Sequence, residues 1–221
     1  MNRIRSGKTF ARLLLCGAMV MLSVMINPIR VQAALPAVPD YGVIVIGDSR
    51  TEYANYYAVK LPNEFYVYGY GMGYDWMNLV GIPQANAIIA SHPEYTRWKI
   101  VSYMGYNDTA RIQEYITDYR NLLAGSWSGY EVYFMSLAAV SDANLYATNL
   151  RNGVAPENMH NNWNADVVAF NQQLYAAFPD HFLDIYTPML SAGFVPEDGI
   201  HYANADANNY LLALMRFGIG N

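Results

Sequence analysis

Five short apolar runs, rich in Val, Ile, Tyr and Phe, alternate along the chain with longer segments of helical periodicity. The runs are VIVI at 43–46, FYVYG at 65–69, WKIVSYM at 98–104, YEVYFMSL at 130–137 and HFLDI at 181–185. Helices are expected between and after them, at about 51–60, 74–90, 109–124, 164–178 and 204–217. Strand–helix alternation predicts an α/β fold, with a mostly parallel five-stranded sheet covered by helices on both faces.

Local signals predict where several of these helices begin. Asp108 or Thr109 is expected to cap the third helix, Asn164 the fourth and Asn204 the last. Pro83 is expected either to break the second helix into two pieces or to start its later part. The stretch 138–163 is the longest irregular one, and two interpretations stay open: an excursion near the functional site, or a plain loop.

The N-terminus has the pattern of an export signal. A basic start, with Arg3, Arg5, Lys8 and Arg12, precedes an apolar stretch over 13–26, and Val31-Gln32-Ala33 resembles a signal-peptidase site. The apolar stretch is short for a membrane span, and Cys16 lies inside it, which argues against lipidation there. We therefore predict a signal peptide over 1–33, one domain over 34–221, and a secreted or cell-envelope protein with no membrane span after cleavage.

Composition then narrows the function of residues 34–221. Cys16 is the only cysteine, so this domain has neither a disulfide nor thiol chemistry. Five of the 13 cationic side chains lie in the predicted leader and all 18 acidic ones lie beyond it, which leaves a net charge of −10. Such an acidic domain is a poor binder of phosphate backbones, so nucleic acid is excluded as a main partner.

Polar and glycine-rich turns follow four of the predicted strands or come shortly after them. They are Gly47-Asp48-Ser49, the glycine cluster 69–73, Gly105-Tyr106-Asn107-Asp108 and Asp198-Gly199-Ile200-His201. In open parallel sheets, ligands bind outside the carboxyl ends of the strands, where these turns are expected to meet. Each turn alone has a sufficient structural explanation, as a tight turn, a helix cap or a helix end.

Together the four turns supply the groups that acyl transfer needs. A serine hydroxyl is a poor nucleophile until a base such as histidine takes its proton, and a carboxylate must hold that histidine in the correct tautomer. Glycine backbone and an asparagine amide are suitable donors for the oxyanion. Asp48 adjoins the serine, and adjacent residues on a turn rarely align with a third group, whereas Asp198 is three residues from His201; we therefore interpret Asp48 as a structural residue of the turn.

These four turns, in this order and over nearly the whole predicted domain, resemble the sequence blocks of the SGNH or GDSL-type hydrolases. The resemblance implies a three-layer α/β/α fold of flavodoxin-like character and ester hydrolysis with no cofactor or metal. It implies that Ser49 is the nucleophile, His201 the general base and Asp198 its orienting partner. The oxyanion donors implied are the N–H of Ser49, the N–H of Gly73 (with Gly71 next) and the amide of Asn107.

One residue departs from the family pattern. The Leu of the Gly-Asp-Ser-Leu motif is replaced by Arg50, which places a cation beside the nucleophile. Two interpretations stay open: an ion pair with a nearby acid, which we favour slightly, or contact with a polar or anionic part of the substrate.

Other enzyme classes lack support in the sequence. Thr51 stands where the Gly-x-Ser-x-Gly elbow of the α/β-hydrolases needs glycine. No P-loop or Gly-x-Gly-x-x-Gly follows a strand, and His92, His160 and His181 lack metal-ligand spacing. The sequence predicts an exported serine esterase that removes a short acyl group, such as acetate, from a carbohydrate or cell-wall polymer. The alternatives are a lipase or lysophospholipase of the same fold and a non-catalytic surface glycan-binding protein.

Overall fold

The computed structural model describes residues 39–220, so the predicted signal peptide lies outside the described residues. Within them, five parallel strands form one sheet in the order β2-β1-β3-β4-β5. The strands are β1 (Tyr41–Gly47), β2 (Glu64–Tyr68), β3 (Arg97–Tyr103), β4 (Glu131–Met135) and β5 (Phe182–Leu183). The predicted α/β class, the parallel sheet and the strand positions are confirmed.

The most apolar run occupies the interior of this sheet. Val43 to Ile46 are almost completely buried, because β1 is flanked by β2 and β3 and covered by helices on both faces. A strand buried on both faces has a continuous apolar sequence, and β-branched residues suit its pleated backbone. The run ends at Gly47, and the chain turns directly into the first helix at Ser49.

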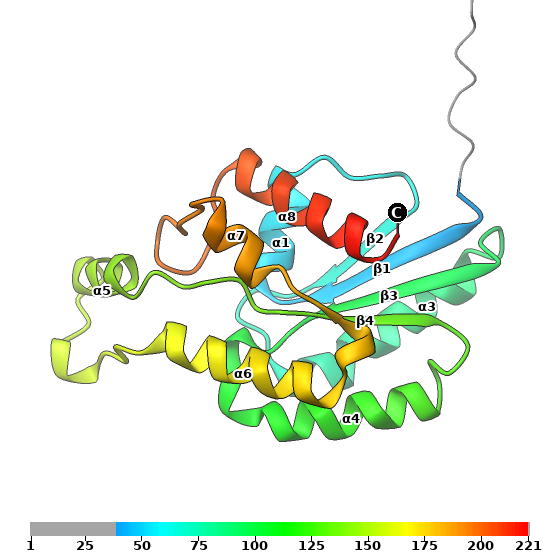
Figure 1. The fold of residues 1–221 in the computed structure, drawn as a ribbon, viewed down its shortest axis with the longest axis horizontal. Coiled ribbons are helices and arrows are strands. Elements are labelled where there is room, and N and C mark those ends of the chain that lie inside the picture. Colours follow the sequence, from blue (N-terminus) through cyan, green and yellow to red (C-terminus); the bar gives the residue numbers. More distant parts are fainter. Residues whose placement is uncertain (1–38, 221) are drawn as a thin grey trace, which may run out of the picture. The chain divides into compact units, whose positions relative to one another are not determined.

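Helices cover the two faces of the sheet, which gives the three layers that the family resemblance implied (Figure 1). One layer holds α1 (Ser49–Tyr57), α7 (Tyr186–Ser191) and α8 (Ala205–Gly218). The other holds α3 (Ile82–Ser91), α4 (Ile112–Ala124) and α6 (Trp163–Ala177). A short α2 (Tyr74–Trp76) and a π-helical turn (Met77–Gly81) lead into α3, and Pro83 lies in the first turn of α3, as predicted.

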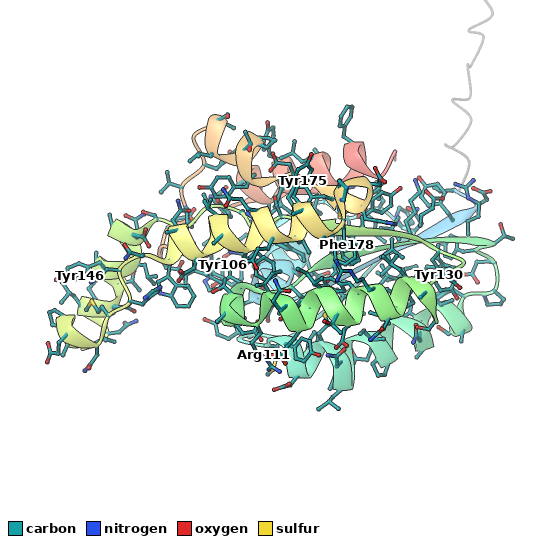
Figure 2. The ribbon with its side chains drawn as sticks, turned by 60° about the horizontal axis from the view of Figure 1, so that its bottom comes forward. Tyr106, Arg111, Tyr130, Tyr146, Tyr175 and Phe178 are labelled. Carbon is teal, nitrogen blue, oxygen red and sulfur yellow. The ribbon has the colours of Figure 1, made fainter. Side chains whose placement is uncertain are left out.

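Aromatic rings fill the space between the sheet and the layer of α4 and α6. Tyr119 stacks on Phe134 of β4 at a centroid distance of 4.1 Å, and Phe178 packs on Phe134 at 4.6 Å. Phe178 follows the last residue of α6 and lies between α6 and α4 (Figure 2). Much of the tyrosine content therefore serves core packing, with hydroxyls that still find partners, such as that of Tyr119 with Ser102.

Two of the predicted helix caps differ from the structure. Asn204 caps α8 through the N–H of Ala207, as predicted, but neither Asp108 nor Thr109 caps α4, which begins after Arg111. A 3-10 turn (Tyr106–Arg111) intervenes, because the Asp108 carboxylate bonds to other parts of the fold. Asn164 lies inside α6 and bonds instead to Val140 and Tyr186.

The stretch 138–163 is more regular than predicted. It contains α5 (Asp142–Arg151), capped by Ser141, and a short 3-10 turn (Pro156–Asn158). In Figure 1, α5 lies beyond the carboxyl ends of the strands, on the side of the sheet where the candidate site is found. Of the two interpretations left open, the excursion near the site is therefore the correct one. Across 39–220, no helix has the length and apolarity that a membrane span requires.

Candidate active site

A chain of hydrogen bonds joins Ser49, His201 and Asp198, which come from opposite ends of the described sequence. The Oγ of Ser49 lies 2.8 Å from the Nε2 of His201. The Nδ1 of the same imidazole lies 2.7 Å from the Oδ2 of Asp198. The structure thus brings together the three residues that the family resemblance implied.

The hydrogen bonds to the Asp198 carboxylate keep it ionised and let it orient the imidazole. Its Oδ1 accepts the backbone N–H groups of Ile200 (2.8 Å) and His201 (2.7 Å). Partial burial raises the pKa of Asp198, but the bonds from the His201 side chain and these N–H groups outweigh it and lower that pKa to about 2. An ionised carboxylate only accepts, so Nδ1 carries the imidazole proton and Nε2 presents its lone pair to Ser49.

Ser49 is placed by the local sequence. Asp48 caps α1, since its Oδ1 accepts the N–H of Arg50 at 3.0 Å, which confirms its predicted structural role. Ser49 is therefore the first residue of α1, where its N–H has no acceptor within the helix. The positive end of the helix dipole favours negative charge at this point, as a developing oxyanion requires.

The glycine cluster 69–73 and the turn 105–108 are tied to each other. The Nδ2 of Asn107 donates to the carbonyl of Met72 (2.8 Å), and the Asp108 carboxylate accepts from the N–H of Tyr74 (2.7 Å). Gly73 lies between these two contacts. A Cβ on Gly73 would come within 2.4 Å of an Asp108 oxygen, whereas one on Gly71, at φ +67°, would meet nothing within 4 Å. Among residues 39–220, neither Asn107 nor Gly73 bonds to Ser49 itself.

A hollow of about 280 Å³ adjoins the candidate oxyanion donors. Gly73 and Asn107 line it together with Asp75 and Arg111. Arg111 bonds to Glu114 and Asp75, and its guanidinium lies 4.2 Å from the centre of the Tyr74 ring. Arg111 projects from the end of the 3-10 turn at the start of α4 (Figure 2). Met72, Tyr74 and Trp76 also line the hollow, so its walls are partly charged and partly apolar.

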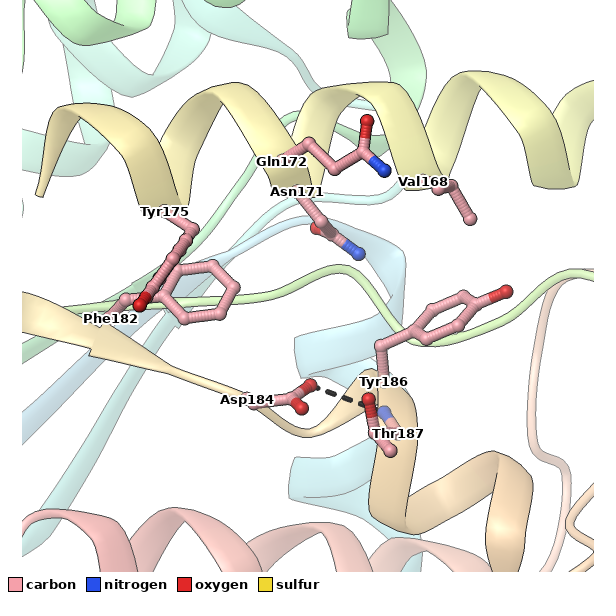
Figure 3. Close-up of a pocket in the computed structure, with 8 residues that line it drawn as sticks. All are labelled: Val168, Asn171, Gln172, Tyr175, Phe182, Asp184, Tyr186 and Thr187. Carbon is pink, nitrogen blue, oxygen red and sulfur yellow. Dashed lines mark hydrogen bonds between the residues drawn. The ribbon is translucent and has the colours of Figure 1, made fainter. Parts of the chain in front are cut away.

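A second, more apolar pocket lies elsewhere, between α6, β5 and the start of α7 (Figure 3). Tyr175, Phe182 and Tyr186 contribute rings to this pocket of about 370 Å³. None of the residues that resemble the family blocks lines it, so it is not the candidate active site.

Arg50 differs from both sequence interpretations. It is 3% exposed, and no carboxylate of residues 39–220 forms an ion pair with it. Its guanidinium instead donates to the carbonyls of Ala138 (2.7 Å) and Ala139 (3.2 Å) and lies 4.0 Å from the centre of the Tyr106 ring. The predicted ion pair is therefore wrong. The alternative, contact with substrate, does not fit either, because the side chain is buried.

Two aromatic rings beside His201 were not predicted. Tyr53 stacks on the imidazole at 4.4 Å and 17°, and Tyr70, which is 64% exposed, lies nearly parallel to it at 5.8 Å. Tyr53 could have been predicted, because it lies four residues after Ser49 on the same helical face. Tyr70 follows Gly69 in a turn whose shape no local pattern determines.

Searches with the sequence alone found no matching family model and no matching curated protein. Solved structures do resemble this fold. The C-terminal catalytic domain of peptidoglycan O-acetyltransferase A from Streptococcus pneumoniae superposes with a TM-score of 0.52 at 12% identity, over 81% of this chain and 92% of that one. A member of the lipolytic G-D-S-L family from Veillonella parvula gives 0.51 at 14% identity, over 80% and 95%.

The chain has the fold of the SGNH hydrolases. The resemblance drawn from the four sequence blocks is thereby confirmed at the level of the fold. Because the SGNH fold hosts different reactions, the activity has to be argued from the site itself.

Proposed function

We propose that this protein is a serine ester hydrolase that removes a short acyl group, such as acetyl, from a carbohydrate or cell-wall polymer outside the cytoplasm. The observation that supports it best is the hydrogen-bonded series Ser49–His201–Asp198 at the carboxyl edge of the sheet. A purely structural serine has no need of a base that is held in one tautomer by an ionised carboxylate.

In the proposed reaction, Ser49 Oγ attacks the ester carbonyl while Nε2 of His201 takes its proton. The oxyanion that forms accepts hydrogen bonds from the N–H of Ser49, the N–H of Gly73 and the amide of Asn107. The C–O bond to the alcohol then breaks, and His201 gives the proton to the leaving oxygen. Water, deprotonated by His201, attacks the acyl-enzyme and releases the acid and free Ser49.

The limited access and small volume of the site favour a small acyl group. Ser49 is 5% exposed and His201 6%, so only a small part of each is accessible. The hollow beside Gly73 and Asn107 has a volume of about 280 Å³, which is at the small end of the range for ligand pockets. These features argue against the lipase alternative.

Transfer of the acyl group to a sugar hydroxyl is the second candidate, because one of the similar structures is a peptidoglycan O-acetyltransferase domain. Both reactions use the same acyl-enzyme, and they differ in whether water or a sugar attacks it.

A fluorophosphonate probe tests the nucleophile directly. We expect stoichiometric labelling at Ser49, located by peptide mass spectrometry, and no labelling of Ser49→Ala. Asp198→Asn should label more slowly by a factor on the order of 10³–10⁴, because the imidazole loses its tautomer control. A folded wild-type protein that is inert to the probe would favour the glycan-binding alternative over an enzyme.

A further inference from the structure

Residues 138–141, which we call the anchor segment, run from the end of β4 towards α5 (Figure 1). They are bonded to the residue that follows each member of the proposed triad. Arg50 follows Ser49, Gly199 follows Asp198 and Tyr202 follows His201. Two turns that are distant in sequence, the one after β1 and the one over 198–202, therefore meet on one short stretch of backbone.

Two of these contacts converge on a single atom. The carbonyl of Ala139 accepts from Nη2 of Arg50 at 3.2 Å and from the hydroxyl of Tyr202 at 3.3 Å. Nη1 of Arg50 also donates to the carbonyl of Ala138 at 2.7 Å. The third contact is a backbone bond, from the N–H of Ser141 to the carbonyl of Gly199 at 3.0 Å.

The anchor segment is itself held firmly. Just before it, the side-chain amide of Asn171 bonds to both the N–H and the carbonyl of Leu137, at 2.8 and 2.9 Å. Within it, the N–H of Val140 donates to Asn164 at 3.1 Å. Ala138 and Ala139 are buried, so each of these bonds lies in a region where competition from water is weak.

Gly199 shows how closely the turn 198–201 packs on α5, the helix that follows the anchor segment. Its φ is +97°, and a Cβ there would lie 2.3 Å from the backbone nitrogen of Leu145 in α5. Asn144 of α5 also donates to the carbonyl of Pro196, two residues before Asp198 (2.9 Å). The turn that carries Asp198 and His201 therefore rests on the anchor segment and the first turn of α5.

We propose that the anchor segment sets the separation of Ser49 from His201, and that Arg50 and Tyr202 are positioning residues for the reaction. This inference rests on the proposed function. Arginine suits the role because its planar fork reaches two successive carbonyls at once, whereas lysine offers a single point of donation and the leucine of the family motif offers none. Both side chains are buried, at 3% and 2% exposure, so neither contacts substrate.

The test compares Arg50→Lys, Tyr202→Phe and the double variant with wild type, using p-nitrophenyl acetate and enzyme titrated with a fluorophosphonate. Tyr119→Phe is the matched control, since it removes a buried hydroxyl that bonds to Ser102 and leaves Arg50 and the anchor bonds in place. Melting temperature and near-UV circular dichroism establish that each variant is folded.

We expect kcat to fall about 5- to 10-fold in Tyr202→Phe and on the order of 10²-fold in Arg50→Lys, with KM within about 2-fold of wild type. The double variant should lose less than the product of the two, because both side chains act on the carbonyl of Ala139. Tyr119→Phe should keep kcat within about 2-fold.

A merely structural role would lower the melting temperature and leave the kcat of titrated enzyme unchanged, which would overturn the proposal. If the kcat of the double variant falls by the product of the two single losses, Arg50 and Tyr202 do not act together through the carbonyl of Ala139, and that part of the proposal is overturned. Wild-type protein without Ser49-dependent turnover would instead overturn the proposed function, and the positioning role with it.

Discussion

At the residue scale, the site depends on which groups keep their charge when buried. Asp198 accepts three hydrogen bonds and stays ionised, whereas Asp48, 1% exposed, has one oxygen that bonds to Arg50 N–H and one with no partner. Burial raises the pKa of Asp48 to about 6, against the opposing effects of that N–H and the Arg50 charge. The pKa values of two acids near the nucleophile are therefore shifted in opposite directions.

Asp48 makes stability depend on pH in a direction that can be measured. In the unfolded chain its pKa is about 3.9. Both states are protonated below about pH 4, the unfolded state alone is ionised between about 4 and 6, and both are ionised above 6. Asp48 therefore costs stability as pH rises from 4 to 6, to a limit of about 3 kcal/mol.

We expect Asp48→Asn, which keeps a cap oxygen, to be about 1–3 kcal/mol more stable than wild type at pH 8 and nearly equal to it at pH 4. Urea unfolding at the two pH values measures this difference, and Asp48→Ala controls for loss of the cap. A variant less stable than wild type at pH 8 would contradict the prediction and would make the carboxylate a necessary counter-ion for Arg50.

Asn107 gives a second residue-scale prediction, on rate rather than stability. If its amide donates to the oxyanion, Asn107→Ala should lower kcat on the order of 10²–10³-fold with KM little changed. The same amide also donates to the carbonyl of Met72, so a substitution of Asn107 loosens the glycine turn as well. Asn107→Asp, which cannot donate, is the comparison, and near-wild-type kcat in both variants would remove Asn107 from the role.

At the scale of elements, the glycine turn and the 3-10 turn are joined through Asp108. Its carboxylate accepts from the N–H of Tyr74 and, at 2.8 Å, from the hydroxyl of Tyr115 in α4. The turn can therefore be tested at two neighbouring glycines that differ in their surroundings.

Gly73→Ala should displace the Asp108 carboxylate and lower kcat by at least about 10-fold, because the turn would shift beside the oxyanion. Gly71→Ala meets no atom within 4 Å but has a φ of +67°, so it should cost about 1 kcal/mol of stability with little change in kcat. Melting curves and kcat on p-nitrophenyl acetate separate the two effects. The reverse result would assign the oxyanion N–H to Gly71.

Whether an element could be predicted from the sequence depends on how far apart in the chain the contacts that form it lie. The strands were predictable because Val43–Ile46 and the other runs carry their own periodicity and β-branched residues. The helix α5 and the true partners of Arg50 were not, since both depend on contacts over about 60 to 90 residues of sequence, such as Ser141 with Gly199 and Arg50 with Ala138. Asp108 was assigned to the nearest helix for the same reason.

At the scale of the whole molecule, the resemblance of the four turns to a family predicted more of the site residues than local sequence patterns did. Ser49, Asp198 and His201 stand next to one another because parallel strands bring their carboxyl ends to one edge, a consequence of topology rather than of spacing in the sequence. The residues that hold these turns in place follow no motif. They are visible only once the chain is folded.

The central claim is that Ser49 drives hydrolysis of short acyl esters. The most direct measurement is kcat/KM on p-nitrophenyl esters from acetate to long acyl chains, for the chain from Ala34 onward and for its Ser49→Ala variant. We predict activity that requires Ser49, is highest with acetate or propionate and falls as the chain lengthens. Activity that rises with chain length would contradict the short-acyl site, and turnover that survives in Ser49→Ala would contradict the mechanism.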